Sequence, residues 1–175
     1  MSLVALLVAT TLLDFDDPAD AALWRPVDDV VMGGVSSSAF GQAAAGVARF
    51  HGNVSLENFG GFASVRTLPR DWDTAGAEAF LLRVRGDGKT YKFTIRTGDG
   101  FDGIQYQQRF TASAGEWSDV RLPVSEFAAT FRGRKVPFTP SLDPAKVRAI
   151  GLMISDKQAG SFELLVDRIA IERRK

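Results

Sequence analysis

The sequence contains no cysteine and only one histidine, His51. The missing thiols exclude disulfides, thiolate nucleophiles and cysteine-ligated zinc. With a single histidine, neither a histidine-based metal centre nor a Ser-His-Asp triad is easily built. Carboxylates are numerous, but their spacing along the chain identifies no acid–base pair. We therefore expect a protein that is not an enzyme and that holds no metal or cofactor.

The sequence also lacks an excess of charge, because 21 basic residues balance 21 acidic ones. This balance argues against duplex DNA or an anionic membrane as a general partner, so we expect no nucleic-acid binding. The apolar run over residues 3–13 is too short to span a bilayer, and we expect no stable membrane insertion. No Lys or Arg precedes that run, so it does not indicate a secretory signal peptide. We interpret residues 1–8 as an N-terminal extension, of which residues 1–3 could be an expression-vector remnant.

Long helical periodicity is missing as well, and short strand-like runs separated by Gly, Asp and Pro take its place. In "KTYKFTIRTG" the residues at 91, 93 and 95 are apolar and those at 92, 94 and 96 are polar, which predicts a strand with two unlike faces. "RGDGKTY" predicts a hairpin turn between two such runs. Short helices are expected at 18–23, 125–128 and 143–147. The predicted strands are 9–15, 30–39, 45–56, 62–68, 78–86, 89–97, 103–112, 117–122, 147–155 and 161–173.

These runs predict a single all-β domain over residues 9–173, built as an antiparallel jelly-roll β-sandwich. Most of the 13 phenylalanines should fill the space between its two sheets.

The stretch "VDDVVMGGVSSS", residues 27–38, gathers acidic, glycine and serine residues where a strand should begin. Aspartates there can accept hydrogen bonds from nearby backbone N–H groups, and paired glycines allow close approaches that a Cβ forbids. A second glycine pair in "ENFGGFASVRT" opens another predicted strand, and we expect the two strands to be neighbours. Two interpretations stay open: a glycine bulge at the start of a strand, or a surface that faces a partner. The residues concerned are Asp28, Asp29, Gly33, Gly34, Ser36, Ser38, Gly60 and Gly61.

A polar face follows if runs 80–85, 91–96 and 104–109 are adjacent strands. Arginines and amides are costly to bury unpaired in a core, so this face is either solvated or a concave groove for a polar ligand or protein segment. Strand parity predicts that Arg83, Arg96 and Arg109 share this face and converge on one groove. Its other members would be Arg85, Thr94, Gln105 and Gln107, and the strand after Gly61 adds Arg66 as a further candidate.

Two later stretches are candidate contact points. In "FAATFRGRKVPFTP", Arg132, Arg134 and Lys135 flank a glycine, which indicates a solvated loop or a basic contact. "ISDKQAGSFELLVD" predicts a hairpin connection that begins at Asp156.

Seven stretches, taken in order, resemble the complex I intermediate-associated protein family from about residue 12 to residue 171. They are "DFDD", Trp24 with "VDDVVMGGVSSS", "FHGNVSLENFGGFASVR", "GDGKTYKFTIRT", "EWSDVRLPVSEF", "TFRGR" and "IGLMISDKQAGSFELLVDRI". The resemblance implies a galactose-binding-like jelly-roll sandwich. It also implies an assembly chaperone for NADH:ubiquinone oxidoreductase that is not part of the finished enzyme. The signature positions that it covers are Trp24, Asp28, Asp29, Gly33, Gly34, Ser36, Asn58, Gly60, Gly61, Arg132, Arg134 and Asp156.

Our leading hypothesis is therefore a non-enzymatic module that binds a protein partner, such as subunits of the respiratory complex. The alternative is a carbohydrate-binding module in which the polar concave face holds a sugar, with Tyr106 or Trp117 as the stacking ring. Mitochondrial members of the family carry a targeting extension, and nothing Arg-rich and amphipathic stands at this N-terminus. We accordingly expect a bacterial, cytoplasmic form.

Overall fold

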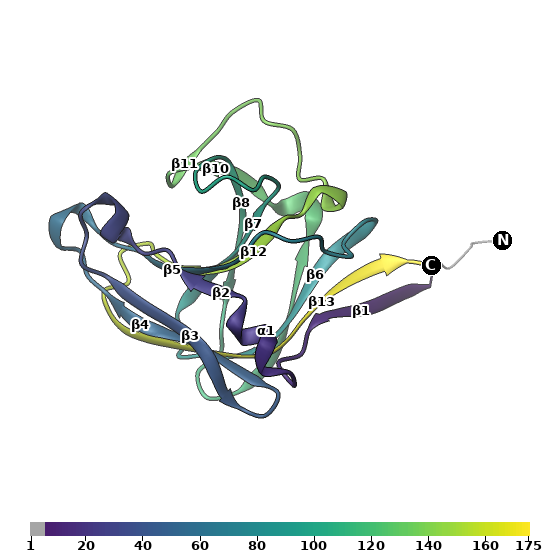
Figure 1. The fold of residues 1–175 in the computed structure, drawn as a ribbon, viewed down its shortest axis with the longest axis horizontal. Coiled ribbons are helices and arrows are strands. Elements are labelled where there is room, and N and C mark those ends of the chain that lie inside the picture. Colours follow the sequence, from purple (N-terminus) through teal and green to yellow (C-terminus); the bar gives the residue numbers. More distant parts are fainter. Residues whose placement is uncertain (1–5) are drawn as a thin grey trace.

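Two antiparallel sheets pack face to face in the computed structural model, which describes residues 6–175 (Figure 1). This arrangement confirms the predicted all-β jelly-roll sandwich. The interpretation of residues 1–3 as a vector remnant lies outside the described residues. The strands are β1 (Leu7–Leu13), β2 (Trp24–Pro26), β3 (Ser37–Ala44), β4 (Val47–Val54), β5 (Ala63–Thr67), β6 (Ala77–Arg85), β7 (Thr90–Arg96), β8 (Gln105–Thr111), β9 (Trp117–Pro123), β10 (Ala128–Phe131), β11 (Arg134–Lys135), β12 (Ala149–Ile154) and β13 (Gly160–Arg174).

Helical structure is confined to short pieces between the strands. The α-helix α1 covers Pro18–Ala22, and its N-terminus is capped by the side chain of Asp17. Four 3-10 turns follow at η1 (Asp29–Met32), η2 (Glu57–Phe59), η3 (Val124–Glu126) and η4 (Pro144–Lys146). The short helices expected near 18–23, 125–128 and 143–147 are thus present. Within residues 6–175, no helix has the length and apolar character needed to cross a membrane.

The six-stranded sheet has the order β3-β4-β13-β6-β9, and β1 joins it through β13. Strand β13 is 15 residues long, and its two halves pair with different neighbours on the same edge. Its first half pairs with β4 and its second half with β1, while β6 runs along its other edge.

The seven-stranded sheet has the order β11-β10-β8-β7-β12-β5-β2. Strand β12 lies between β5 and β7, so Gly151 on β12 is opposite Arg66 on one side and Thr94 on the other. On β7, residues 91, 93 and 95 are buried in the core, as the alternating pattern predicted. Residues 92, 94 and 96 therefore lie on the outer face of this sheet.

The core is aromatic and joins the two sheets. Phe80 of β6 meets Phe93 of β7 at a ring distance of 5.3 Å, and Phe50 of β4 meets Tyr91 of β7 at 6.3 Å. Seven of the 13 phenylalanines are buried, and burying one such side chain contributes about 1.5–3 kcal/mol. Four others are exposed, so they do not belong to the core: Phe59, Phe101, Phe131 and Phe138.

Three local predictions were wrong. The run at 30–39 is not one strand, because residues 29–32 form η1 and β3 starts only at Ser37. The segments 86–89 and 155–159 are not hairpin turns, because each connects strands of different sheets. In segment 86–89, where the chain passes from one sheet to the other, the N–H groups of Gly86 and Gly88 donate to the carbonyls of Ser113 and Ala112. A turn sequence fixes a local reversal but does not decide which sheet the next strand joins.

Candidate functional site

The carboxylate of Asp29 lies at the start of η1 and is fully buried. It accepts hydrogen bonds from the backbone N–H and the hydroxyl of Ser36, at 2.9 and 2.6 Å. It also accepts from the N–H groups of Gly61 and Phe62, at 2.7 and 3.3 Å. Burial alone would raise the pKa of Asp29, but the bonds from Ser36, Gly61 and Phe62 outweigh it and hold that pKa below its ordinary value.

One glycine of each pair packs directly against this carboxylate. A Cβ on Gly34 would lie 2.4 Å from Cγ of Asp29, and one on Gly60 would lie 2.5 Å from its Oδ2. Gly33 ends η1 in the left-handed region, at φ +90°. The strands that follow the two pairs, β3 and β5, lie in different sheets. The prediction that they are neighbouring strands was therefore wrong, and a buried side chain links the loops that precede them instead.

Asp28 has a similar role one residue earlier. Its carboxylate accepts from the N–H and the hydroxyl of Ser38, at 2.9 and 2.6 Å, and from the N–H of Ser64 at 2.9 Å. The adjacent aspartates thus tie the start of β3 to the start of β5. They do what the sequence predicted, accepting backbone N–H groups, but over a span of up to 36 residues.

The loops fastened in this way expose apolar side chains. Val30, Val31 and Met32 are consecutive in η1, and each is about 60% exposed. In η2, Asn58 and Phe59 adopt left-handed backbone angles, at φ 54° and 60°, and Phe59 is fully exposed. Exposed apolar side chains that lie next to one another often mark an interaction surface, whereas single scattered ones do not.

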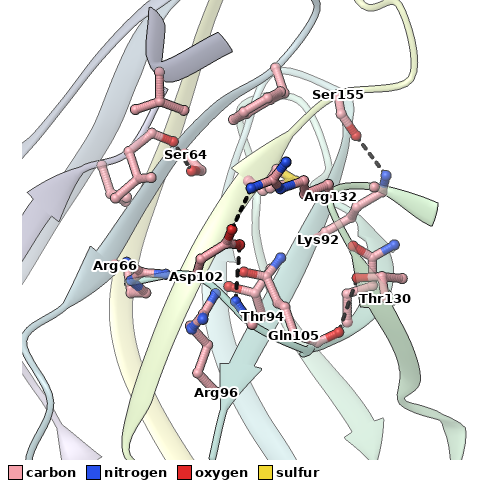
Figure 2. A pocket seen from close by; sticks show the side chains of 18 of the residues that line it. Ser64, Arg66, Lys92, Thr94, Arg96, Asp102, Gln105, Thr130, Arg132 and Ser155 are labelled. Carbon is pink, nitrogen blue, oxygen red and sulfur yellow. Dashed lines mark hydrogen bonds and ion pairs between the residues drawn. The ribbon is translucent and has the colours of Figure 1, made fainter. Parts of the chain in front are cut away.

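A groove of about 490 Å³ crosses the outer face of the seven-stranded sheet beside these loops. Figure 2 shows its polar side chains pointing into it from β5, β7, β8 and β10 and from the β7–β8 and β10–β11 connections. Val31 and Met32 border it, so the exposed apolar loop and the polar floor form one surface. The polar and charged lining comprises Ser64, Arg66, Lys92, Thr94, Arg96, Asp102, Gln105, Gln107, Thr130, Arg132, Ser155 and Asp156.

Three ion pairs lie along this groove. Arg132 contacts Asp102 at 2.7 Å, and Asp156 accepts from both Lys92 at 3.1 Å and Arg109 at 2.9 Å. Burial acts to raise the pKa of Asp156, but its bonds with Lys92 and Arg109 hold that pKa below the ordinary range.

Arg66 and Arg96 join none of the ion pairs found within residues 6–175. Arg96 is 8% exposed, and its Nε has no hydrogen-bond partner among the residues that the structure describes. A terminal nitrogen of Arg96 donates to the carbonyl of Gly100 at 3.3 Å, and one of Arg66 donates to that of Phe101 at 3.4 Å. Both are long contacts to neutral acceptors.

The predicted polar face is partly correct in its geometry. The structure places seven of the predicted residues in the groove lining. Arg109 does not line the groove itself but forms an ion pair with Asp156, which does. The prediction that Arg83 converges with Arg96 and Arg109 was wrong. Arg83 and Arg85 lie on β6 in the six-stranded sheet, where Arg83 pairs with Asp119 at 3.3 Å. The seven predicted residues that do line the groove are Arg66, Thr94, Arg96, Gln105, Gln107, Arg132 and Asp156.

The remaining signature residues have other places. Trp24 is buried and stacks on Phe40 at 4.3 Å, and Arg134 is exposed on β11 and is not among the residues that line the groove. The sequence did not indicate Phe101 and Asp102, since they belong to an irregular glycine-containing loop without periodicity. Lys92 was placed on the correct face by alternation, but it was not selected as a site residue.

Neither aromatic candidate for sugar stacking faces the groove. Tyr106 is buried and donates its hydroxyl to the carbonyl of Pro140 at 2.9 Å. Trp117 starts β9 in the six-stranded sheet, where the Arg83 guanidinium lies over its ring. Within residues 6–175, no three His, Asp or Glu side chains are grouped so that they could hold a metal ion.

The fold defines the class: a jelly-roll β-sandwich, the architecture also found in carbohydrate-binding modules. The family 11 module of the cellulase Lic26A-Cel5E of Clostridium thermocellum superimposes with a TM-score of 0.71 at 16% identity, covering 95% of both chains. The agarase AgWH50C contains a similar domain, with a TM-score of 0.59 at 14% identity over 93% of this chain and 24% of the agarase. At such identities the likeness shows the fold alone.

The family is shown by sequence. Residues 13–166 match the family model of Complex I intermediate-associated protein 30 (CIA30), and the chain belongs to that family.

Several relatives carry that family's name. The mitochondrial complex I intermediate-associated protein 30 of Neurospora crassa is 30% identical over 70% of this chain, and that of Drosophila melanogaster is 25% identical over 91%. An uncharacterised protein of Schizosaccharomyces pombe, C9E9.15, is 31% identical over 83% of the chain. The matched region spans 50%, 61% and 76% of these relatives respectively.

These relatives also correct one expectation. The Neurospora, Drosophila and mouse proteins are mitochondrial by name, which contradicts the expected cytoplasmic location. The expectation depended on the lack of an Arg-rich, amphipathic stretch at the N-terminus of this sequence, and the beginning of a sequence is weak ground for assigning a compartment.

Proposed function

We propose that this chain is a non-enzymatic protein-binding module that acts in the assembly of NADH:ubiquinone oxidoreductase, where it holds subunits of the respiratory complex. Membership of the CIA30 family supports the assembly role. The observation that carries the binding role is the exposed apolar loop of η1, which borders a polar groove and is fastened by a buried carboxylate. An apolar loop held in one shape loses little conformational entropy when a partner covers it.

The same surface supports a protein ligand better than a sugar. Sugar rings stack on flat aromatic faces, but the side chains of η1 that border the groove are aliphatic, Val31 and Met32. The ring of Phe101, which also lines the groove, is already covered by the Arg66 guanidinium at 5.4 Å. Phe62 is the other aromatic residue that lines the groove, so the carbohydrate alternative has the likeness of fold and this one ring in its favour, against the larger exposed apolar loop.

Affinity capture from mitochondria tests the proposal. The tagged chain should enrich subunits of complex I assembly intermediates, identified by mass spectrometry, and Met32→Asp should lose at least nine-tenths of that enrichment. A matched control is Leu7→Asp, because Leu7 is also exposed but lies on β1 of the other sheet. Capture of no respiratory subunit by the unaltered chain would overturn the assembly role. Equal losses for both variants would remove η1 as the contact.

A further inference from the structure

Arg66 and Arg96 stand on the two strands that flank β12. Arg66 is opposite Gly151, and Arg96 is opposite Ala149, the next outward-facing position of the same strand. Two small residues on β12 leave no side chain that could screen one guanidinium from the other. Figure 2 shows both guanidinium groups in the same part of the groove, near Asp102.

Neither guanidinium group has an ion-pair partner within residues 6–175, and Asp102 acts on Arg96 only from a distance. Burial, followed by the charge of Arg96, lowers the pKa of Arg66, and burial lowers that of Arg96 while Asp102 acts in the opposite direction. A guanidinium nevertheless stays protonated in proteins, so both remain cations. Buried cations are normally paired with a carboxylate. Arg96 is buried and Arg66 half-buried, yet in the part of the chain that the structure describes their hydrogen bonds go to the carbonyls of Gly100 and Phe101, and Arg66 also lies over the Phe101 ring.

We propose that Arg66 and Arg96 form a carboxylate-binding site, which takes an acidic side chain of a partner protein segment lying in the groove. The site rests on the proposed function. Arginine suits this ligand because its planar fork of N–H donors matches the two oxygens of a carboxylate. The terminal nitrogens of both arginines, which now donate to neutral carbonyls at 3.3 and 3.4 Å, are the donors that such a ligand would take.

The rest of the groove specifies the segment around that acidic residue. Its lining contains four cationic side chains and two carboxylates, so an acidic occupant is complementary in charge. Val31, Met32 and Met153 line the same groove and accept apolar side chains. The occupant is therefore an extended segment in which acidic residues stand next to large apolar ones.

Isothermal titration calorimetry at low ionic strength tests the site with the acetylated hexapeptide Glu-Leu-Glu-Ser-Glu-Leu. We expect the peptide to bind, and its counterpart with Gln in place of Glu to bind at least tenfold more weakly. The double variant Arg66→Gln/Arg96→Gln should lose at least tenfold in affinity for the acidic peptide. Arg83→Gln is the matched control, since it removes a partly exposed arginine from the other sheet.

Four results would overturn the site: no binding of the acidic peptide, equal binding of both peptides, equal losses in the double variant and the control, or tighter binding of inorganic phosphate than of the acidic peptide. Affinity capture separates this inference from the proposed function. If the unaltered chain and the double variant capture complex I subunits equally, the carboxylate site fails and the function stands. If neither captures them but the peptide still binds through both arginines, the assembly function fails and the site stands.

Discussion

Oδ2 of Asp29 accepts a hydrogen bond of 2.7 Å from the backbone N–H of Gly61, 32 residues further along the chain. The same carboxylate binds Ser36, so one buried side chain fastens the loop before β3 to the loop before β5. Those loops carry the exposed apolar side chains of η1 and η2. The proposed contact surface is thus held in shape by a side chain that solvent does not reach.

Replacing this carboxylate by an amide should destabilise the protein strongly. In Asp29→Asn, an NH₂ group would face backbone N–H donors, which leaves buried donors unsatisfied. We expect the free energy of unfolding in urea to fall by about 3 kcal/mol. Asp14→Asn is the control, because Asp14 is exposed and its carboxylate accepts a local bond from the N–H of Asp16. A loss below about 0.5 kcal/mol for Asp29→Asn would show that the loops are held by other contacts.

The stabilising effect of Asp29 should depend on acid pH. Its pKa is lowered in the folded protein, so its contribution is complete above the unfolded value of about 3.9 and disappears as pH falls through the folded value. The difference in unfolding free energy between the unaltered protein and Asp29→Asn should therefore shrink as pH decreases from about 5 to about 2. Asp87 and Asp156 also have lowered pKa values, but they titrate in both proteins and cancel. A difference that stays constant from pH 7 to pH 2 would contradict this account.

Glycine is required where Asp29 packs against the backbone. A Cβ at Gly34 would lie 2.4 Å from the carboxylate carbon, so Gly34→Ala must displace the buried side chain. We expect a loss of about 2 kcal/mol by urea denaturation. Gly41→Ala on β3 is the control, because no atom lies within 4 Å of its added Cβ and that change should alter stability little. If both substitutions have the same effect, the close approach at Gly34 is not what excludes a side chain.

The sequence predicted which face of a strand each side chain occupies better than it predicted which strands are neighbours in a sheet. Alternation is local, so it placed Thr94 and Arg96 correctly on the outer face of β7. Arg83 has the same local pattern, yet its strand belongs to the other sheet, and the segment between β6 and β7 crosses over instead of turning back. That choice depends on contacts with Ser113 and Ala112, which lie more than 20 residues away and leave no signal near the turn.

The candidate site was predictable to the same extent. "VDDVVMGGVSSS" was identified as a segment whose aspartates bind backbone N–H groups, because these residue types do so in most loops. Its partners at Gly61 and Ser64 are set by the packing of the two sheets. The loop that carries Phe101 and Asp102 has no periodic pattern, so only the structure places it over the two arginines.

A final prediction concerns the stability of the protein without the buried charge of Arg96. Replacing it by Met keeps much of its apolar stem and removes a cation that has no carboxylate partner within residues 6–175. Replacing buried charges by apolar side chains is often neutral or stabilising, so Arg96→Met should gain about 1 kcal/mol and raise Tm by about 3 °C.

Scanning calorimetry of the unaltered protein, Arg96→Met and Arg83→Met makes the comparison. Arg83 is partly exposed and pairs with Asp119 at 3.3 Å, so Arg83→Met should change the unfolding free energy by less than about 1 kcal/mol. A residue that lowers the stability of the protein and is nevertheless present points to a role in binding. The stabilised Arg96→Met protein should therefore also bind the acidic hexapeptide at least tenfold more weakly. A Tm several degrees below that of the unaltered protein would instead assign the Arg96 guanidinium to the support of the β7–β8 loop through Gly100.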